Sequence, residues 1–138
     1  MGKGSYGFPG LRNASFGQPK NTIRGNLKSI LRRYKPDKDG FIGVRAKSES
    51  HPEYRKFVAK DPVEAAKRLF RSLGRGGVQK PLPGPNNTVK GWKRTMLNGD
   101  VISYRPRESS DGSPVVDIKI VSKTSGGLKY QKIHFYSK

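Results

Sequence analysis

The fold is decided by residues 92–138, which read WKRTMLNGDVISYRPRESSDGSPVVDIKIVSKTSGGLKYQKIHFYSK. Apolar and polar residues alternate with period two through four segments of this stretch, which predicts β-strands with one apolar and one polar face. These strands are expected at 92–97, 100–105, 115–122 and 128–136. The dipeptide Asn98-Gly99 is typical of a type I′ turn, so the first two strands should form a hairpin.

Helical patterns precede this sheet. Apolar residues recur with helical spacing over 21–34, and a shorter helix is predicted over 50–60 from a capping box. In the best-defined helix, Asp61 is the N-cap and Pro62 occupies the first helical position. This helix ends before Gly74. We therefore expect an α+β fold in which N-terminal helices pack on one face of a C-terminal four-stranded antiparallel sheet.

By length, residues 21–138 are expected to form a single domain with a helical half at 21–80 and a sheet half at 88–138. Residues 1–20 are rich in glycine and poor in aliphatic side chains, which predicts a flexible basic tail. The glycine- and proline-rich stretch 74–85 should connect the two halves. It lacks the ending and flanking elements of a P-loop, so nucleotide hydrolysis is not expected.

The charge balance is the strongest indication of a partner. The chain carries 29 Lys and Arg against 10 Asp and Glu, a formal net charge of +19. Repulsion among so many positive charges disfavours the folded state, so a net charge of this size is typical of proteins that bind a polyanion. We expect nucleic acid first and an anionic membrane surface second. No cysteine is present, which excludes disulfides and thiol chemistry. No apolar run is long enough for a membrane span.

The polar face of the predicted sheet carries a set of side chains that an ordinary solvated face does not need. Its members are Ser103, Arg105, Asp117, Lys119, Tyr130, Lys132, His134 and Tyr136. Two strand registers keep the apolar residues on one face. In one, Asp117 faces His134; in the other, Asp117 faces Lys132 and Val115 faces His134. In both, a carboxylate, an ammonium group and an imidazole lie close enough to alter one another's pKa.

This combination fits RNA cleavage without a metal, which needs a base, an acid and cations around the phosphorane. His134 is the expected acid or base, Arg105 and Lys132 hold the phosphate, and Asp117 orients the imidazole or carries the other proton. Further substrate contacts are expected from Lys119, Tyr130, Tyr136, Ser103, Arg107, Ser110 and Arg94. Asp111 and Ser113, in the loop between two strands, are interpreted as ordinary turn formers.

Two other functions stay open at this point. A nonenzymatic RNA- or DNA-binding protein would need only the same charge. A metal-dependent DNase would need clustered carboxylates or several histidines, whereas the chain has two His, far apart in sequence. No metal or other cofactor is therefore expected.

The segments LNGDVISYR at 97–105, SSDGSPVVDI at 109–118 and QKIHF at 131–135 resemble the C-terminal toxin modules of bacterial polymorphic toxins. Such modules are similar in fold to the barnase, colicin and RelE-type ribonucleases. No predicted strand carries the glutamate base of barnase, and the Lys, Arg and Tyr content is more similar to RelE. The resemblance implies a target RNA such as tRNA or rRNA, an acidic immunity protein and a larger delivery polypeptide. It also implies an antibacterial toxin that a bacterial export system delivers and that acts in the target-cell cytoplasm.

Overall fold

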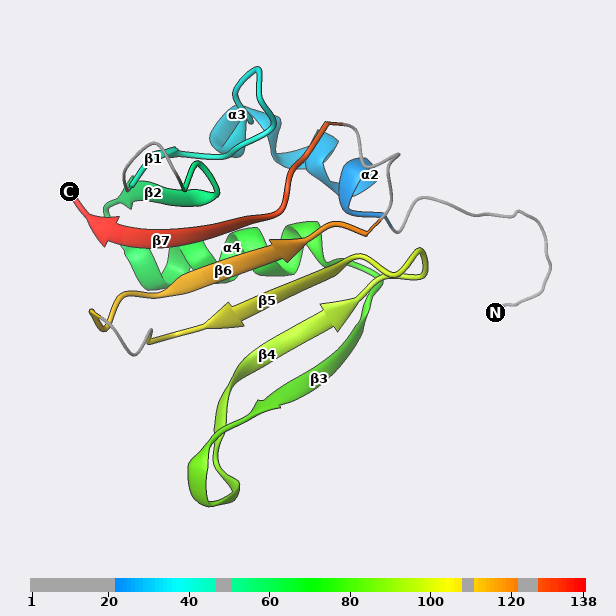
Figure 1. Ribbon diagram of the computed structural model, residues 1–138, viewed down its shortest axis with the longest axis vertical. Helices are drawn as coiled ribbons and strands as arrows, with labels where there is room; N and C mark the ends of the chain where they lie inside the picture. Colours follow the sequence, from blue (N-terminus) through cyan, green and yellow to red (C-terminus); the bar gives the residue numbers. More distant parts are fainter. Residues whose placement is uncertain (1–21, 47–50, 108–110, 122–126) are drawn as a thin grey trace, which may run out of the picture.

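The computed structural model describes residues 22–46, 51–107, 111–121 and 127–138. The predicted tail at 1–20 lies outside these residues. The elements are α2 (Ile23–Leu27), a 3₁₀ turn (Lys28–Ile30), α3 (Leu31–Tyr34), β1 (Val44–Arg45), β2 (Tyr54–Ala59), α4 (Pro62–Leu73), β3 (Val78–Pro83), a 3₁₀ turn (Pro85–Asn87), β4 (Val89–Thr95), β5 (Val101–Arg105), β6 (Val115–Lys119) and β7 (Gln131–Ser137). The strands form one sheet in the order β1-β2-β7-β6-β5-β4-β3 (Figure 1).

The predicted fold class is wrong, because the sheet has seven strands and is mixed rather than four-stranded and antiparallel. The four predicted strands correspond to β4 to β7, which pair antiparallel in chain order. The region expected to be the helical half, 21–80, contributes β1, β2 and half of β3. β2 joins the sheet parallel to β7, which places the final strand of the described chain between an early strand and a late one.

β2 occupies the segment that was predicted to be a short helix, and a buried arginine explains the error. Arg55 is only 5% exposed and lies on the core side of the sheet, where strand alternation favours an apolar residue. Its guanidinium donates to Asp37 Oδ2 at 3.1 Å and to the carbonyls of Ile42, Pro52 and Gly43. A buried charge is tolerated when it is paired and fully hydrogen-bonded. The contacts with Asp37, Ile42 and Gly43 span 12 to 18 residues of sequence, so the local pattern did not reveal the strand.

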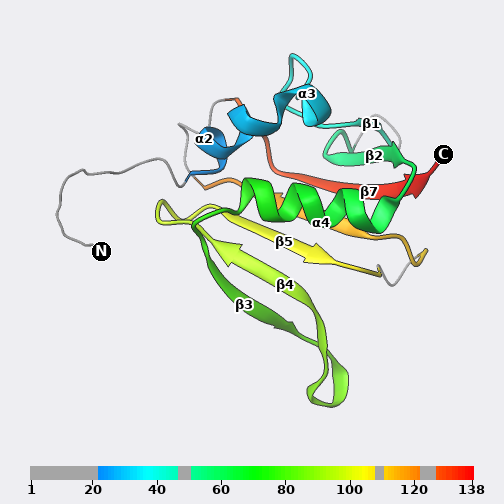
Figure 2. The same cartoon turned by 180° about the vertical axis from the view of Figure 1, so that it is seen from behind.

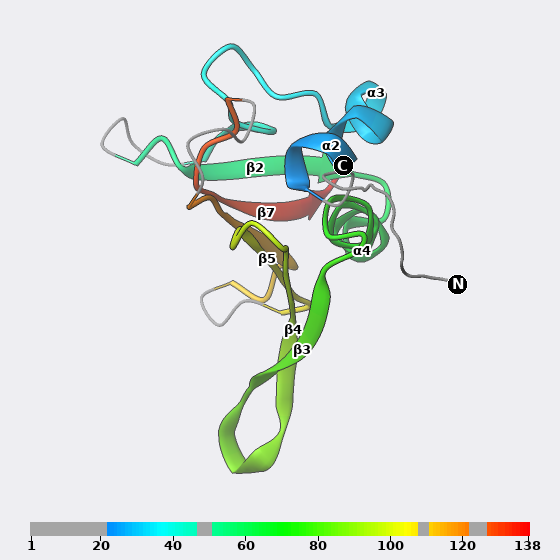
Figure 3. The ribbon, with the colours of Figure 1, turned by 90° about the vertical axis from the view of Figure 1, so that its right-hand side faces the viewer.

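β3 lies at the edge of the sheet, in the stretch predicted to be a linker. It contains two prolines, Pro81 and Pro83, which argue against a central strand but are tolerated at an edge where no partner needs their missing N–H. Asn86 and Asn87, with φ angles of 54° and 61°, close the hairpin to β4. Thr88 N donates to Pro85 O at 3.1 Å, so this is the turn with type I′ geometry. Figure 3 shows the resulting β3–β4 hairpin extending away from the rest of the molecule.

The turn at Asn98-Gly99 differs from the prediction, although the hairpin that it closes is confirmed. Only Gly99 has a positive φ, 94°, and the loop is bounded by a hydrogen bond of 2.8 Å from Met96 N to Asp100 O. Gly99 N donates to Met96 O, which makes a three-residue loop with a glycine bulge rather than a two-residue type I′ turn.

The helix predicted after Asp61 is confirmed as α4, which packs against β2, β5, β6 and β7 on one face of the sheet (Figure 2). Asp61 Oδ1 accepts from Glu64 N at 3.1 Å at its start. At its end, Asn26 Nδ2 donates to the carbonyls of Leu73 and Arg75 at 2.7 and 3.0 Å, which ties α2 to α4.

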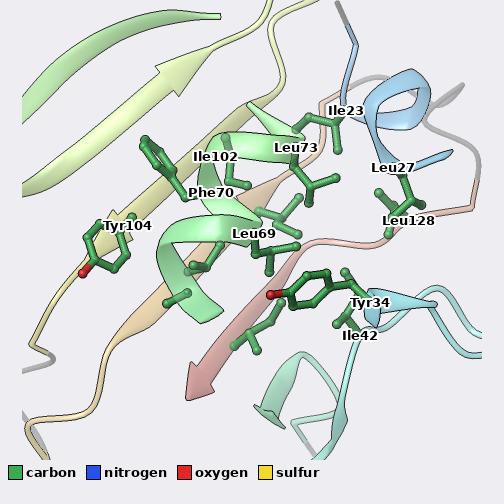
Figure 4. Close-up of a cluster of buried hydrophobic side chains, with 14 of the residues drawn as sticks. Ile23, Leu27, Tyr34, Ile42, Leu69, Phe70, Leu73, Ile102, Tyr104 and Leu128 are labelled. Atoms are coloured by element: carbon green, nitrogen blue, oxygen red, sulfur yellow. The ribbon is translucent and has the colours of Figure 1, made fainter. Parts of the chain in front are cut away.

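The hydrophobic core lies between α4, the N-terminal helical segment and this sheet face. The side chains labelled in Figure 4 come from these parts and from the segments that precede β1 and β7: Ile23, Leu27, Tyr34, Ile42, Leu69, Phe70, Leu73, Ile102, Tyr104 and Leu128. The predicted helix over 21–34 is divided into α2, a 3₁₀ turn and α3. Within the described residues, no helix is both long and apolar enough to cross a membrane. With α4 on one face, the site must be sought on the other.

Candidate nucleic-acid interface and catalytic site

Strand register aligns polar side chains in a row across the sheet face that points away from α4. The paired residues, from β2 through β7, β6, β5 and β4 to β3, are Tyr54, Lys132, Asp117, Ser103, Lys93 and Lys80. We call this set the polar row. Directly paired residues project to the same side of a sheet, so the row is a continuous strip that crosses six strands.

The polar row crosses a hollow of about 470 Å³. The hollow is lined by Tyr54, Leu82, Lys90, Lys93, Val101, Ser103, Arg105, Asp117, Lys119, Tyr130 and Lys132. Five of these side chains are cationic, and Asp117 is the single acid among the described residues of the lining. Two tyrosines lie among them, and Tyr130 is 47% exposed. Cations beside exposed aromatic rings are the combination that binds phosphates and stacks bases of single-stranded nucleic acid.

Asp117 pairs with Arg105 inside this hollow. Arg105 Nη2 lies 3.1 Å from Asp117 Oδ2, and the two side chains are only 18% and 19% exposed. Of the two registers allowed by sequence, the structure has the one in which Asp117 faces Lys132 and Val115 faces His134. Asp117 therefore holds the Arg105 guanidinium rather than lying opposite the imidazole.

His134 is not among the residues that line this hollow. It lies two residues along β7 from Lys132, on the same face of the sheet, and is oriented by a different acid. Ser113 Oγ is 2.9 Å from His134 Nδ1, and it donates to Asp111 Oδ1 at 2.6 Å. Asp111 also accepts from Ser113 N at 3.0 Å and from the Tyr136 hydroxyl at 2.7 Å. These hydrogen bonds, those of the Ser113 side chain and the Tyr136 hydroxyl first, hold the pKa of the Asp111 carboxyl well below its usual value. Burial and the bond to Asp111 raise the pKa of Tyr136, so Tyr136 keeps its proton.

This series of hydrogen bonds sets the tautomer of His134. A hydroxyl has one proton, and Ser113 gives it to the ionised carboxylate of Asp111. The Ser113 oxygen can then only accept from Nδ1–H of His134. In the neutral imidazole the lone pair consequently lies on Nε2, and this is the nitrogen that can take a proton from a substrate.

Lys56 supplies a cation beside His134 that sequence analysis did not find. The parallel pairing of β2 with β7 places Lys56 directly beside His134. The Lys56 Nζ lies 5.4 Å from the centre of the Tyr136 ring. Because residues 50–60 were predicted to be helical, neither Lys56 nor Tyr54 was assigned to the site. The alternation of Tyr54, Lys56 and Val58 with Arg55, Phe57 and Ala59 would have signalled a strand only if the buried Arg55 had been anticipated.

The other predicted substrate contacts are distributed unevenly. Ser103, Lys119 and Tyr130 line the hollow, as do the predicted catalytic residues Arg105, Asp117 and Lys132. Arg94 lies on the opposite face, where its guanidinium is 5.0 Å from the Phe70 ring centre and donates to Gln79 Oε1. Arg107 is exposed in the loop after β5, and Ser110 lies outside the described residues.

Sequence reasoning also missed Asp111, Ser113, Lys80 and Lys93. The first two were interpreted as turn formers, and Ser113 N does donate to Asp111 Oδ1 as in an Asx turn. They lie near His134 because Ser113 contacts His134, which is 21 residues later in the sequence, and no local pattern predicts this contact. Lys80 and Lys93 become neighbours only through the β3–β4 pairing.

Comparison with known proteins adds no assignment to this geometry. No protein-family model matches the chain, and neither a curated protein nor a solved structure matches it. Within the described part of the chain, no group of three or more His, Cys, Asp or Glu side chains is arranged to hold a metal ion.

Proposed function

We propose that this chain is a metal-independent endoribonuclease in which His134 is the general base. The observation that carries the proposal is the series Asp111–Ser113–His134 on the sheet face that also carries the cation-lined hollow, with His134 two residues along β7 from Lys132. A carboxylate that fixes the tautomer of a histidine through hydrogen bonds is a recurrent device of general base catalysis. An ordinary basic binding surface does not need it.

In the proposed reaction, these groups act on one phosphodiester bond of RNA. Nε2 of His134 takes the proton of a ribose 2′-hydroxyl, and the oxygen attacks the adjacent phosphorus. The bond from phosphorus to the 5′ oxygen of the next nucleotide breaks, which leaves a 2′,3′-cyclic phosphate. The departing oxygen takes a proton from a neighbouring ammonium group, for which strand pairing favours Lys56 and Lys132. Lys132 and the Arg105 guanidinium held by Asp117 stabilise the extra negative charge of the phosphorane.

The toxin context belongs to the same proposal. A delivered antibacterial ribonuclease needs an inhibitor in the cell that makes it, and an acidic immunity protein would complement the net charge of +19 and cover the lysines of this face. The delivery polypeptide and the action in the target-cell cytoplasm rest on the sequence resemblance alone.

A nonenzymatic RNA-binding protein is the second candidate. The observation that favours it is the breadth of the basic face, since Lys90 and Lys93 line the hollow on β4, which is separated from the His134 strand by β5 and β6. Binding alone would use these lysines and leave His134 without a chemical role.

The test incubates the purified protein with total RNA and with plasmid DNA, each in EDTA and in magnesium. We expect RNA to be cleaved in EDTA, with 2′,3′-cyclic phosphate ends, and the plasmid to stay intact. His134→Ala should lower the cleavage rate roughly 10²- to 10⁴-fold, the usual contribution of a positioned general base. His51→Ala is the matched control, because the His51 side chain is 51% exposed and contacts Glu53 and Tyr54, whereas Ser113 and Asp111 contact His134. It should retain the wild-type rate.

Other results would contradict the proposal in distinct ways. Plasmid cleavage that requires magnesium, with RNA left intact in EDTA, would indicate a DNase. Tight RNA binding without cleavage would indicate a binding protein. A folded His134→Ala variant that cleaves RNA at the wild-type rate would remove His134 from the mechanism.

A further inference from the structure

A second hollow lies on the β3–β4 side of the sheet and has no part in the chemistry proposed for His134. It encloses about 460 Å³. Its apolar lining includes Val78, Met96 and Leu97, and its cationic lining consists of Lys80 and Lys93. Lys93 also lines the first hollow, so the two hollows adjoin at this residue. The polar row continues from one into the other.

Charge repulsion between Lys80 and Lys93 destabilises the free protein. Lys80 and Lys93 are directly opposite in the β3–β4 ladder, and like charges in this position destabilise a strand pair. In the described part of the chain, neither lysine forms an ion pair or a side-chain hydrogen bond with another residue. A bound phosphate between them would convert the repulsion into attraction.

The apolar lining is similarly open to solvent. The Leu97 side chain is fully exposed and Val78 is 62% exposed. Exposed aliphatic side chains next to paired cations match a nucleotide, whose base has an apolar face and whose phosphate is anionic. A protein partner would have to match the same lysines with acids, whereas a nucleotide supplies both features in one unit.

We propose that this second hollow binds an unpaired nucleotide of the RNA substrate, away from the cleaved bond. Lys93 is three strand spacings from Lys132 across the sheet, about 14 Å. This is longer than one nucleotide step, so an RNA strand that crosses the β-strands would bridge the two sites. The base must be unpaired, because stacking between neighbouring base pairs of a duplex covers the faces that Leu97 and Val78 would contact. The position of the cleaved bond rests on the proposed ribonuclease function; the binding site does not.

The test measures the binding of RNA that cannot be cleaved. Fluorescein-labelled 2′-O-methyl RNA dinucleotide and hexanucleotide are titrated with protein, and the Kd is read from fluorescence anisotropy. The wild type should bind the hexanucleotide at least about tenfold more tightly than the dinucleotide, since one further charge-assisted contact between a phosphate and Lys80 or Lys93 is worth this much. Lys80→Glu and Leu97→Ser should each remove most of this gain and leave dinucleotide binding nearly unchanged.

Lys67→Glu is the matched control, because it makes the same charge change on the exposed side of α4, behind the sheet. It should retain tight hexanucleotide binding. Equal losses for Lys80→Glu and Lys67→Glu would show that only net charge matters and would overturn the proposal. A hexanucleotide duplex that binds as tightly as the single strand, with the same dependence on Lys80, would also overturn it.

Two further measurements keep the outcomes separate. Thermal melting checks that each variant is folded, and Leu97→Ser decides the question if Lys80→Glu does not fold. Cleavage of the unmodified hexanucleotide in EDTA is measured in parallel. Tighter binding of the hexanucleotide without cleavage would support binding at the second hollow and contradict the ribonuclease proposal. Cleavage with equal affinity for the two RNA lengths would support the ribonuclease proposal and contradict binding at the second hollow.

Discussion

Asp111→Asn tests the orientation of His134 without removing a group that touches the substrate. The ionised Asp111 accepts the Ser113 proton at 2.6 Å, and this forces Nδ1 of His134 to donate to Ser113. An asparagine can turn its NH₂ group toward Ser113. Ser113 would then donate its proton to Nδ1, and the neutral imidazole would carry its own proton on Nε2. In that tautomer Nε2 cannot act as a base.

The magnitude follows from the geometry. Where a carboxylate contacts a catalytic histidine directly, replacement by the amide lowers kcat about 10⁴-fold. Here Ser113 lies between the two groups, and the Asp111 side chain is 41% exposed, so water replaces part of the lost interaction. We expect a decrease of about 10- to 100-fold, which corresponds to about 1.4 to 2.7 kcal/mol in the activation free energy. Ser113→Ala, which leaves the tautomer free rather than reversed, should cost less.

The assay follows initial rates of cleavage of a short fluorescent RNA in EDTA from pH 5 to pH 9. The Asp111→Asn variant should cleave RNA more slowly at every pH at which neutral His134 is the active form. A changed pH profile of the cleavage rate would indicate that His134 is misoriented, whereas a general loss of folded protein would lower the rate without changing the profile. Asp39→Asn, in the exposed loop at 37–41, is the control for loss of one negative charge. A folded Asp111→Asn protein with the wild-type rate and pH profile, alongside an inactive His134→Ala protein, would refute the role of this hydrogen-bond series.

Two further predictions concern stability. Because the folded-state pKa of Asp111 lies below its unfolded value, its contribution is fully present above about pH 4 and is lost as the pH falls through the folded-state pKa. The urea midpoints of wild type and Asp111→Asn should therefore differ at pH 6 and converge toward pH 2, and a constant difference would contradict the linkage. Gly91→Ala would place its Cβ 2.9 Å from Arg105 Cγ and even nearer to Tyr104 O, so it should destabilise the protein by about 1 to 3 kcal/mol and displace Arg105. Gly112→Ala, which meets nothing within 4 Å, tests the cost of a positive φ alone; equal midpoints for the two variants in urea unfolding would contradict the clash at Gly91.

The parts of the fold that sequence analysis predicted are those set by neighbouring residues. The alternation that marks β4 to β7 and the caps at Asp61 and Gly74 are local signals, and the structure follows them. The missed strands depend on distant partners. Arg55 is acceptable in β2 only because Asp37 and three carbonyl groups surround it, and the prolines of β3 are acceptable only because that strand lies at an edge.

The residues of the candidate site also fall into those that a local pattern predicts and those that depend on distant strand pairing. Period-two alternation was enough to place Arg105, Asp117, Lys132 and His134 on one face, since parity does not depend on register. The hydrogen-bond partner of the imidazole did depend on the register of β6 and β7. In the observed register, Asp117 pairs with Arg105, and His134 contacts Ser113. Lys56 and Lys80 were beyond prediction because each reaches the face through a strand that the sequence pattern concealed.

Because β7 lies inside the sheet, its insertion both completes the sheet and brings the candidate site residues into place. β7 follows every other described strand along the chain and yet lies between β2 and β6, so the sheet consists of two unconnected halves until β7 is inserted. Its pairing with β2 spans most of the domain, and contacts of such long range form slowly during folding. The same strand carries Lys132, His134 and Tyr136. A ribosome-bound chain that has not yet released β7 therefore has neither a complete sheet nor His134, the proposed general base. The proposed activity would arise in the same step that completes the fold.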